Sequence, residues 1–227
     1  MQKISLAVFD MAGTVVNEDN VVYKTLQKAI NQSGYDIALD YVLEHGAGKE
    51  KHQAIKDILK VKDNITDDEL SASIFENFKK LLDQAYETLH VTSYRGVEDL
   101  LDYLKDNGIK RALNTGYDSA TANLLLNKMG WELGNQYDLL VTADDVTLGR
   151  PHPAMILKAM NDLGITDAQM VLKAGDSIID IEEGKNAKCG VTVGVTTGAQ
   201  TFEQLASAEP TFVLDELAGL KDLIPVG

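Results

Sequence analysis

Residues 4–14 read ISLAVFDMAGT, and this stretch decides the fold. The run from Ile4 to Phe9 is apolar and contains β-branched residues, which predicts a buried strand that ends at the carboxylate of Asp10. In the turn that follows, free backbone N–H groups can receive phosphate oxygens while Asp10 acts as a nucleophile. Asp-x-x-Gly-Thr is also ordinary turn chemistry, so the function of the stretch depends on later segments.

Strand-like and helix-like segments alternate through the rest of the chain. Apolar runs predict strands at 109–113, 137–142, 171–174 and 191–195, with an edge strand at 211–214. Helical spacing occurs between them at 97–107, 119–129, 153–163 and 179–187. This alternation predicts an α/β fold, in which helices cover both faces of a parallel, Rossmann-like sheet.

Residues 15–94 interrupt this alternation, because they contain no convincing strand. Helical patterns occur instead at 21–32, 38–44, 48–59 and 67–89. We therefore expect an all-helical cap domain at 15–94, inserted into a core domain made of 1–14 and 95–227. A helical insertion after the first strand suggests an active site that can close over the carboxyl ends of the strands.

A second acidic segment follows the strand expected at 171–174. It places Asp176 at the strand end and Asp180 four residues later. Carboxylates from two strand ends, together with water and a phosphate oxygen, suit Mg²⁺. Alternatively, Asp176 and Asp180 would be a helix N-cap and a first-turn acid. The presence of Asp10 favours the metal site.

Two further segments offer groups that bind phosphate. Thr115, Gly116 and Tyr117 follow a strand and supply a hydroxyl and backbone donors, although the same residues would suit a plain turn with a threonine cap. Arg150 lies in a loop stiffened by proline, and its planar guanidinium can grip phosphate oxygens with two hydrogen bonds.

Composition excludes several classes of function. The net charge of −14 argues against a nucleic acid or an anionic membrane as partner. A single cysteine, Cys189, excludes an internal disulfide framework and a cysteine-based zinc site. The first apolar run is too short for a signal peptide, so we expect a soluble, cytoplasmic protein. We also expect its partner to be a small-molecule substrate.

The four segments, in this order, resemble the motifs of the haloacid dehalogenase superfamily, with Asp10, Thr115, Arg150 and Asp176 on them. Most members carry an acid at the position of Ala12 and a lysine at that of Arg150. Phosphonoacetaldehyde hydrolases share both departures, and the chain resembles them most. The resemblance implies a magnesium ion on Asp10, the Ala12 carbonyl and Asp176, with Asp180 behind them. It also implies a substrate site formed by Ala12, Gly13, Thr115, Gly116 and Tyr117.

Those hydrolases form a Schiff base between a cap lysine and the substrate aldehyde. Their Gly-x-x-Lys-x-x-His segment is similar to residues 46–52, which implies that Lys49 is the Schiff-base lysine and that His52 moves protons. On a helix these two residues would share one face. Neighbouring Lys51 is interpreted as a solvated surface charge.

The lysine in the cap gives a reason for the absence of an acid at Ala12. Breaking a phosphate ester at neutral pH benefits from an acid that protonates the leaving oxygen. Breaking a C–P bond releases a carbanion, which needs an electron sink such as a protonated imine. The predicted reaction is therefore cleavage of phosphonoacetaldehyde or a related 2-oxoalkylphosphonate. The alternatives are a phosphomonoesterase and a catalytically idle binding protein. The resemblance also leaves open a homodimer that pairs through the cap.

Overall fold

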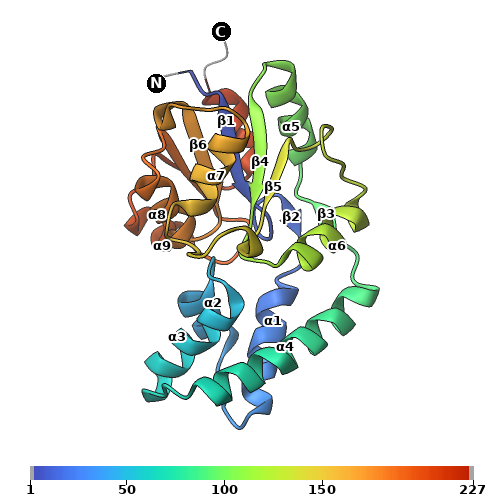
Figure 1. Cartoon of the computed structure of the whole chain (residues 1–227), viewed down its shortest axis with the longest axis vertical. Coiled ribbons are helices and arrows are strands. Elements are labelled where there is room, and N and C mark those ends of the chain that lie inside the picture. Colours follow the sequence, from blue (N-terminus) through green and yellow to red (C-terminus); the bar gives the residue numbers. More distant parts are fainter. Residues whose placement is uncertain (1–2, 225–227) are drawn as a thin grey trace.

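The computed structural model describes residues 3–224, and its core is a six-stranded parallel sheet (Figure 1). The strand order is β5-β4-β1-β6-β7-β8, with β1 near the centre. The strands are β1 (Leu6–Asp10), β4 (Lys110–Asn114), β5 (Leu139–Val141), β6 (Val171–Gly175), β7 (Val191–Val195) and β8 (Phe212–Leu214). Each strand expected from the sequence is present within two residues of its predicted bounds, and the predicted fold class is confirmed.

The two faces of β1 bury alternate side chains, as the period of a strand requires. Leu6 and Val8 belong to an apolar cluster with Met155 and Ile156, whereas Ala7 and Phe9 belong to a second, larger one. The core helices are α5 (Val97–Asp106), α6 (Ser119–Met129), α7 (Ala154–Asp162), α8 (Ile178–Asn186) and α9 (Phe202–Ser207). Short 3₁₀ turns lie at Ala143–Asp145, Ala168–Met170 and Leu217–Asp222.

Four helices lie together beyond the carboxyl ends of the strands, and we call them the cap helices (Figure 1). They are α1 (Val21–Gln32), α2 (Leu39–Gly46), α3 (Lys51–Asp63) and α4 (Asp68–Thr88). Their apolar faces bury one another, with Leu26 and Ile30 of α1 and Ile74 of α4 among the buried residues. The cap helices therefore cover the edge of the sheet at which Asp10 ends β1.

The structure differs from the expected helical insertion in two places. A two-stranded antiparallel ribbon, formed by β2 (Val16–Asn17) and β3 (Thr92–Ser93), connects the cap helices to the core, although no strand was expected there. In addition, α3 begins at Lys51, three residues later than predicted, because the side chain of Glu50 caps it by accepting from the backbone N–H groups of His52 and Gln53.

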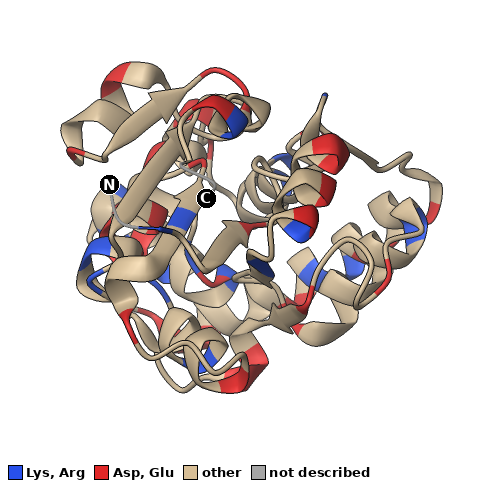
Figure 2. Cartoon of the chain, turned by 90° about the horizontal axis from the view of Figure 1, so that it is seen from above, with Lys and Arg blue, Asp and Glu red and all other residues tan. Residues whose placement is uncertain are grey.

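The surface agrees with the acidic composition. Asp and Glu residues, red in Figure 2, are spread over several helices and loops. Within residues 3–224, no helix combines the length and the apolar character that a membrane crossing requires.

Candidate active site

The candidate active site lies where β1, β4 and β6 end side by side. In the parallel register, Asp10 pairs with Asn114 of β4, and Phe9 pairs with Ala174 of β6. Carboxylate oxygens of Asp10, Asp176 and Asp180 lie within 4.8 Å of one another, and all three residues are buried. The structure thus gathers the three acids that the sequence suggested for a metal site.

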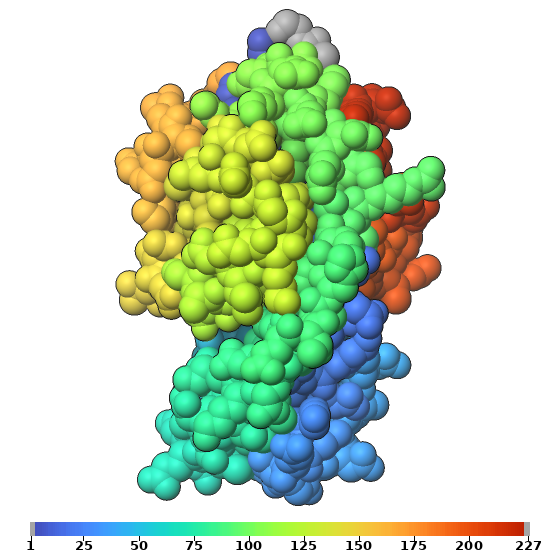
Figure 3. All heavy atoms as spheres, turned by 90° about the vertical axis from the view of Figure 1, so that its right-hand side faces the viewer, coloured from blue at the N-terminus to red at the C-terminus, as the bar shows by residue number. Residues whose placement is uncertain are grey.

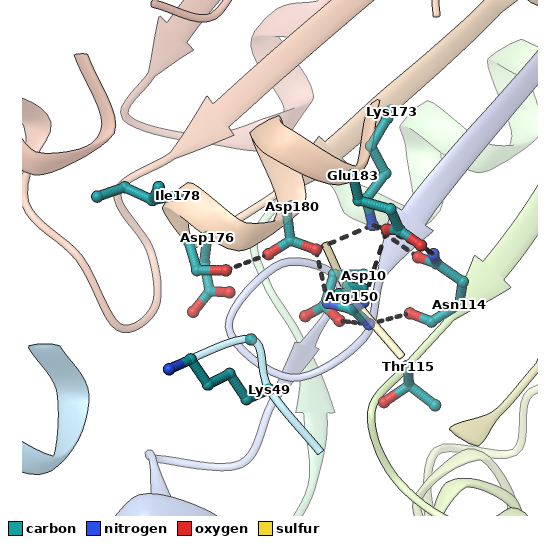
Figure 4. Close-up of polar contacts among 12 residues, drawn as sticks. Asp10, Lys49, Asn114, Thr115, Arg150, Lys173, Asp176, Ile178, Asp180 and Glu183 are labelled. Carbon is teal, nitrogen blue, oxygen red and sulfur yellow. Dashed lines mark hydrogen bonds and ion pairs between the residues drawn. The ribbon is translucent and has the colours of Figure 1, made fainter. Parts of the chain in front are cut away.

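Two buried cations lie against these acids, and Figure 4 shows the network. Arg150 donates from Nη2 to Asp10 Oδ1 and from Nη1 to Asp180 Oδ1, both at 2.6 Å. Lys173 lies 2.9 Å from Asp180 Oδ1 and 3.3 Å from Glu183 Oε2. Arg150 therefore orients the expected nucleophile while both cations engage Asp180.

The pKa values of the acids differ according to their partners. Burial raises the pKa of Asp10, against the opposing charge of Arg150. Burial, together with the charges of Asp10 and Asp180, raises the pKa of Asp176 well above its usual range. Burial alone would raise the pKa of Asp180 as well, but Lys173 and Arg150 hold it below its usual range. Negative charge is thus poorly compensated at Asp10 and Asp176.

This charge pattern fits a divalent cation between Asp10 and Asp176. Both are hard oxygen ligands of the kind that Mg²⁺ prefers. Asp180 would lie behind the direct metal ligands, because both of its carboxylate oxygens are already engaged. Arg150 and Lys173 contact its Oδ1, and Ser177 donates to its Oδ2. The donor set therefore agrees with the expected cofactor.

Adding Mg²⁺ should raise the melting temperature of the protein, and Asp176→Asn should abolish most of that rise. Ligand at about 100 times its dissociation constant stabilises the folded state by about 3 kcal/mol. Thermal unfolding with and without Mg²⁺ measures both effects. A wild-type melting temperature that does not change when Mg²⁺ is added would contradict the metal site. Without Mg²⁺, the variant should melt at or above the wild-type temperature, because a repulsive charge is gone.

The turn after Asp10 leaves no room for larger residues. Gly13 has a φ of 87°, which side-chain-bearing residues rarely adopt, and a Cβ there would collide with the carboxylate of Asp176. Ala12 lines a small pocket together with Asp10. The backbone therefore passes directly beside the proposed metal ligands, as the sequence prediction requires of Ala12 and Gly13.

The small pocket measures about 10 Å³ and joins residues from distant parts of the chain. We call it the catalytic pocket, and its lining is Asp10, Ala12, Tyr23, Gly48, Lys51, Thr115, Gly116, Tyr117 and Arg150. Gly116 packs against the cap, because a Cβ there would lie 3.1 Å from the carbonyl oxygen of Lys49. The cap helices are thus closed onto the core.

Lys49 does not point into this pocket, contrary to the sequence prediction. It lies in the loop before α3, and its Nζ forms an ion pair of 2.5 Å with Asp57. Figure 4 shows its side chain extending away from Asp10 and Arg150. The sequence prediction assumed a helix that starts at Gly48, whereas α3 starts at Lys51.

Lys51 does line the catalytic pocket, and it is not the surface charge that the sequence suggested. The residue is 7% exposed, and its Nζ donates to the Lys49 carbonyl at 2.7 Å. The Nζ lies 5.1 Å from the ring centre of Tyr23 and 5.6 Å from that of Tyr117. Burial, and then the charge of Arg150, lowers the pKa of Lys51 to about 8.

His52 also lies away from the catalytic pocket. Its ring stacks on Phe75 at 5.1 Å, and Nε2 is 3.3 Å from the hydroxyl of Ser71. Because consecutive residues of a helix face different directions, the burial of Lys51 turns His52 toward α4. The structure therefore does not support the proton-transfer role predicted for His52.

Glu18 is a buried acid that the sequence analysis did not identify. It is 2% exposed, accepts from the Val22 N–H at 3.0 Å and interacts with the hydroxyl of Tyr86. That hydroxyl donates in turn to Tyr117 at 3.3 Å. Burial raises the pKa of Glu18 from 4.5 to about 7, against the opposing charge of Lys51.

Glu18→Gln should make the protein more stable than the wild type at high pH. Because the folded-state pKa is raised, the wild type loses stability as pH rises from about 4.5 to about 7 and does not regain it above that range. Relative to pH 5, we expect the variant to gain about 1 to 3 kcal/mol at about pH 8. Urea unfolding at both pH values measures this gain, and parallel pH profiles would contradict the assignment.

Lys173, Asn114 and Glu183 complete the buried network, and sequence reasoning missed all three. Asn114 donates from Nδ2 to both carboxylate oxygens of Glu183 and accepts from Lys173 Nζ at 2.6 Å. A signal was available for Lys173, since a charged residue stands within an otherwise apolar strand. Such a residue requires buried partners, because an isolated charge is costly to bury.

Comparison with known proteins identifies the family of the chain. The family model described as haloacid dehalogenase-like hydrolase matches residues 7–194. A phosphonoacetaldehyde hydrolase of Latilactobacillus sakei is 35% identical over 208 residues, covering 86% of this chain and 76% of the relative. A protein of the same name from Parabacteroides distasonis is 32% identical over 216 residues, covering 88% of this chain and 78% of that one.

Solved structures show the same fold. A phosphonoacetaldehyde hydrolase-like protein from Oleispira antarctica has a TM-score of 0.83 at 22% identity, covering 98% of this chain and 92% of that chain. A hydrolase from Pseudomonas syringae has a TM-score of 0.84 at 20% identity, covering 96% of each chain. The chain therefore belongs to the haloacid dehalogenase-like hydrolase family and, within it, is similar to the phosphonoacetaldehyde hydrolases.

Proposed function

We propose that this protein is a magnesium-dependent hydrolase that cleaves the C–P bond of phosphonoacetaldehyde or a related 2-oxoalkylphosphonate. Lys51 forms an imine with the substrate carbonyl, and Asp10 attacks phosphorus to form an aspartyl phosphate. One observation carries this proposal: Lys51, a buried lysine of the cap, and Asp10 line the same small pocket.

Lys51 is suited to imine formation because it can lose its proton near neutral pH. A pKa of about 8 leaves a useful fraction of neutral amine, which is the nucleophilic form. The aromatic faces of Tyr23 and Tyr117 stabilise a cation at Lys51 better than aliphatic side chains would. They can therefore also stabilise the protonated imine that follows.

The phosphoryl group is attacked by Asp10 and bound by Arg150 and Thr115. Arg150 keeps Asp10 oriented and can neutralise phosphoryl oxygens, while the Thr115 hydroxyl lies in the same pocket. When bound, Mg²⁺ would supply the remaining positive charge between the carboxylates and the phosphoryl oxygens.

The residue at Ala12 distinguishes this proposal from a phosphomonoesterase. An ester needs an acid beside Asp10 for its leaving oxygen, and Ala12 cannot provide one. When the C–P bond breaks, its electron pair instead passes through the protonated imine on Lys51 to give an enamine. Protonation of the enamine carbon and hydrolysis then release the aldehyde and regenerate the amine, while water hydrolyses the aspartyl phosphate.

Phosphate release from phosphonoacetaldehyde tests the proposed function. We expect turnover that requires Mg²⁺ and stops with a chelator, and much slower turnover of common phosphate esters. Comparable or faster hydrolysis of an ester would favour the phosphomonoesterase, and absence of turnover of either class would favour a binding protein.

A further inference from the structure

A large cleft adjoins the catalytic pocket and is not needed for an aldehyde substrate. It measures about 600 Å³ and lies between cap helix α4 and the residues that follow β4. Figure 3 views the face on which these two parts of the chain meet. Lys51, Gly116 and Tyr117 line both the cleft and the catalytic pocket, so the two spaces adjoin at these three residues.

The position of Lys51 determines which part of a substrate would enter the cleft. The phosphoryl group belongs beside Asp10, Thr115 and Arg150, which line the catalytic pocket but not the cleft. The carbonyl carbon must reach Lys51. The remaining substituent on that carbon then points away from phosphorus, toward the cleft. In phosphonoacetaldehyde this substituent is a hydrogen atom, which would leave the cleft to solvent.

The walls of the cleft include several apolar side chains. Phe75, Phe78 and Leu82 come from α4, and Leu124 comes from α6, where it is 39% exposed. Leu124 is therefore an apolar side chain that a ligand could cover, with a gain in free energy that grows with the area buried.

The charges around the cleft disfavour an anionic substituent. Its lining includes four acids, which are Glu50, Asp83, Asp118 and Asp144. Against them stand Lys51, which is assigned to the carbonyl, and Lys79, which pairs with Glu76 at 2.6 Å and lies over the ring of Phe75. An uncharged substituent fits this surface better than a carboxylate does.

We propose that the substrate is a 2-oxoalkylphosphonate with an uncharged, apolar alkyl or aryl group on its carbonyl, and that this group lies in the cleft between α4 and α6. The inference rests on the proposed function. The reaction balances as R–CO–CH₂–PO₃²⁻ plus water giving R–CO–CH₃ plus hydrogen phosphate. The electron pair of the C–P bond forms the new C–H bond with a proton from water, and Lys51 returns to its free amine.

Comparison of kcat/KM across a substrate series tests the inference. The series carries hydrogen, methyl, butyl, phenyl or carboxylate at R, with phosphate release as the readout. We expect the butyl ketone to exceed the methyl ketone by about 50-fold, because three additional methylenes are buried in the transition state. The carboxylate should be the slowest of the ketones.

Two matched variants locate the effect. Leu124→Trp fills the cleft and should bring the butyl-to-methyl ratio of kcat/KM close to one. Leu133→Trp changes another exposed leucine, 67% exposed and outside the lining of the cleft, and should leave the ratio as in the wild type. A ratio measured within one preparation does not depend on the fraction of folded protein.

The possible failures are distinguishable. Turnover of the aldehyde with no turnover of any ketone would overturn the inference and leave the proposed function standing. Absence of turnover for every phosphonate would overturn both. Light scattering gives a further outcome: a wild-type dimer that Leu124→Trp dissociates would assign the cleft to a second copy of the chain and overturn the substrate assignment.

Discussion

Replacing Lys51 with arginine is expected to lower kcat for phosphate release from phosphonoacetaldehyde by about 10³-fold or more, because a guanidinium stays protonated and cannot form the imine. The positive charge is retained, so the loss would report the missing covalent step and not a missing ion. Initial rates at saturating substrate measure it. Thermal unfolding should accompany the assay, since Lys51 is buried and arginine is larger.

Lys49→Arg is the matched control for this prediction. Lys49 lies two residues away and pairs with Asp57, a contact that arginine can reproduce. We expect its kcat to remain within about twofold of the wild type, as is usual for a surface substitution. A large loss in Lys49→Arg together with an active Lys51→Arg would reverse the assignment of the two lysines.

Asp10→Asn should abolish measurable phosphate release, with a loss of about 10⁴-fold or more, because an amide is a poor nucleophile toward phosphorus. The two covalent steps use different residues, so this variant should still form the imine with the substrate. Borohydride would then trap substrate on an enzyme that does not release phosphate. Substantial turnover by Asp10→Asn would contradict the nucleophilic role of Asp10.

Most of the fold could be predicted because the strands of a buried parallel sheet are apolar on both faces. Runs such as Val191–Val195 therefore stand out clearly from the helices around them. The ribbon of β2 and β3 could not be predicted in the same way. Each of its strands has only two residues, too few to show a period, and tertiary pairing alone holds Val16 opposite Ser93.

The core half of the site was predictable for a related reason. Parallel strands place their carboxyl ends at one edge, so acids that follow two strands must come close together. This argument correctly gathered Asp10 with Asp176 and Asp180. The ion pairs of Asp180 with Arg150 and Lys173 could not be predicted in this way. They depend on the directions in which the side chains point at the carboxyl ends of the strands.

The cap lysine could not be chosen from the sequence alone. Two overlapping Gly-x-x-Lys spacings occur, one from Gly46 to Lys49 and one from Gly48 to Lys51. The start of α3 decides between them, and its cap is Glu50, which is not among the residues that usually cap helices. A helix predicted to begin three residues too early favours Lys49, whereas Lys51 is the lysine that lines the catalytic pocket.

The most direct test of the account is to map the lysine that borohydride traps. The enzyme is incubated with phosphonoacetaldehyde, reduced, digested and analysed by mass spectrometry, with Lys51→Arg and Lys49→Arg prepared in parallel. We expect a reduced adduct on Lys51 in the wild type and in Lys49→Arg, and none in Lys51→Arg. An adduct on Lys49, or phosphate release without any trapped lysine, would contradict it.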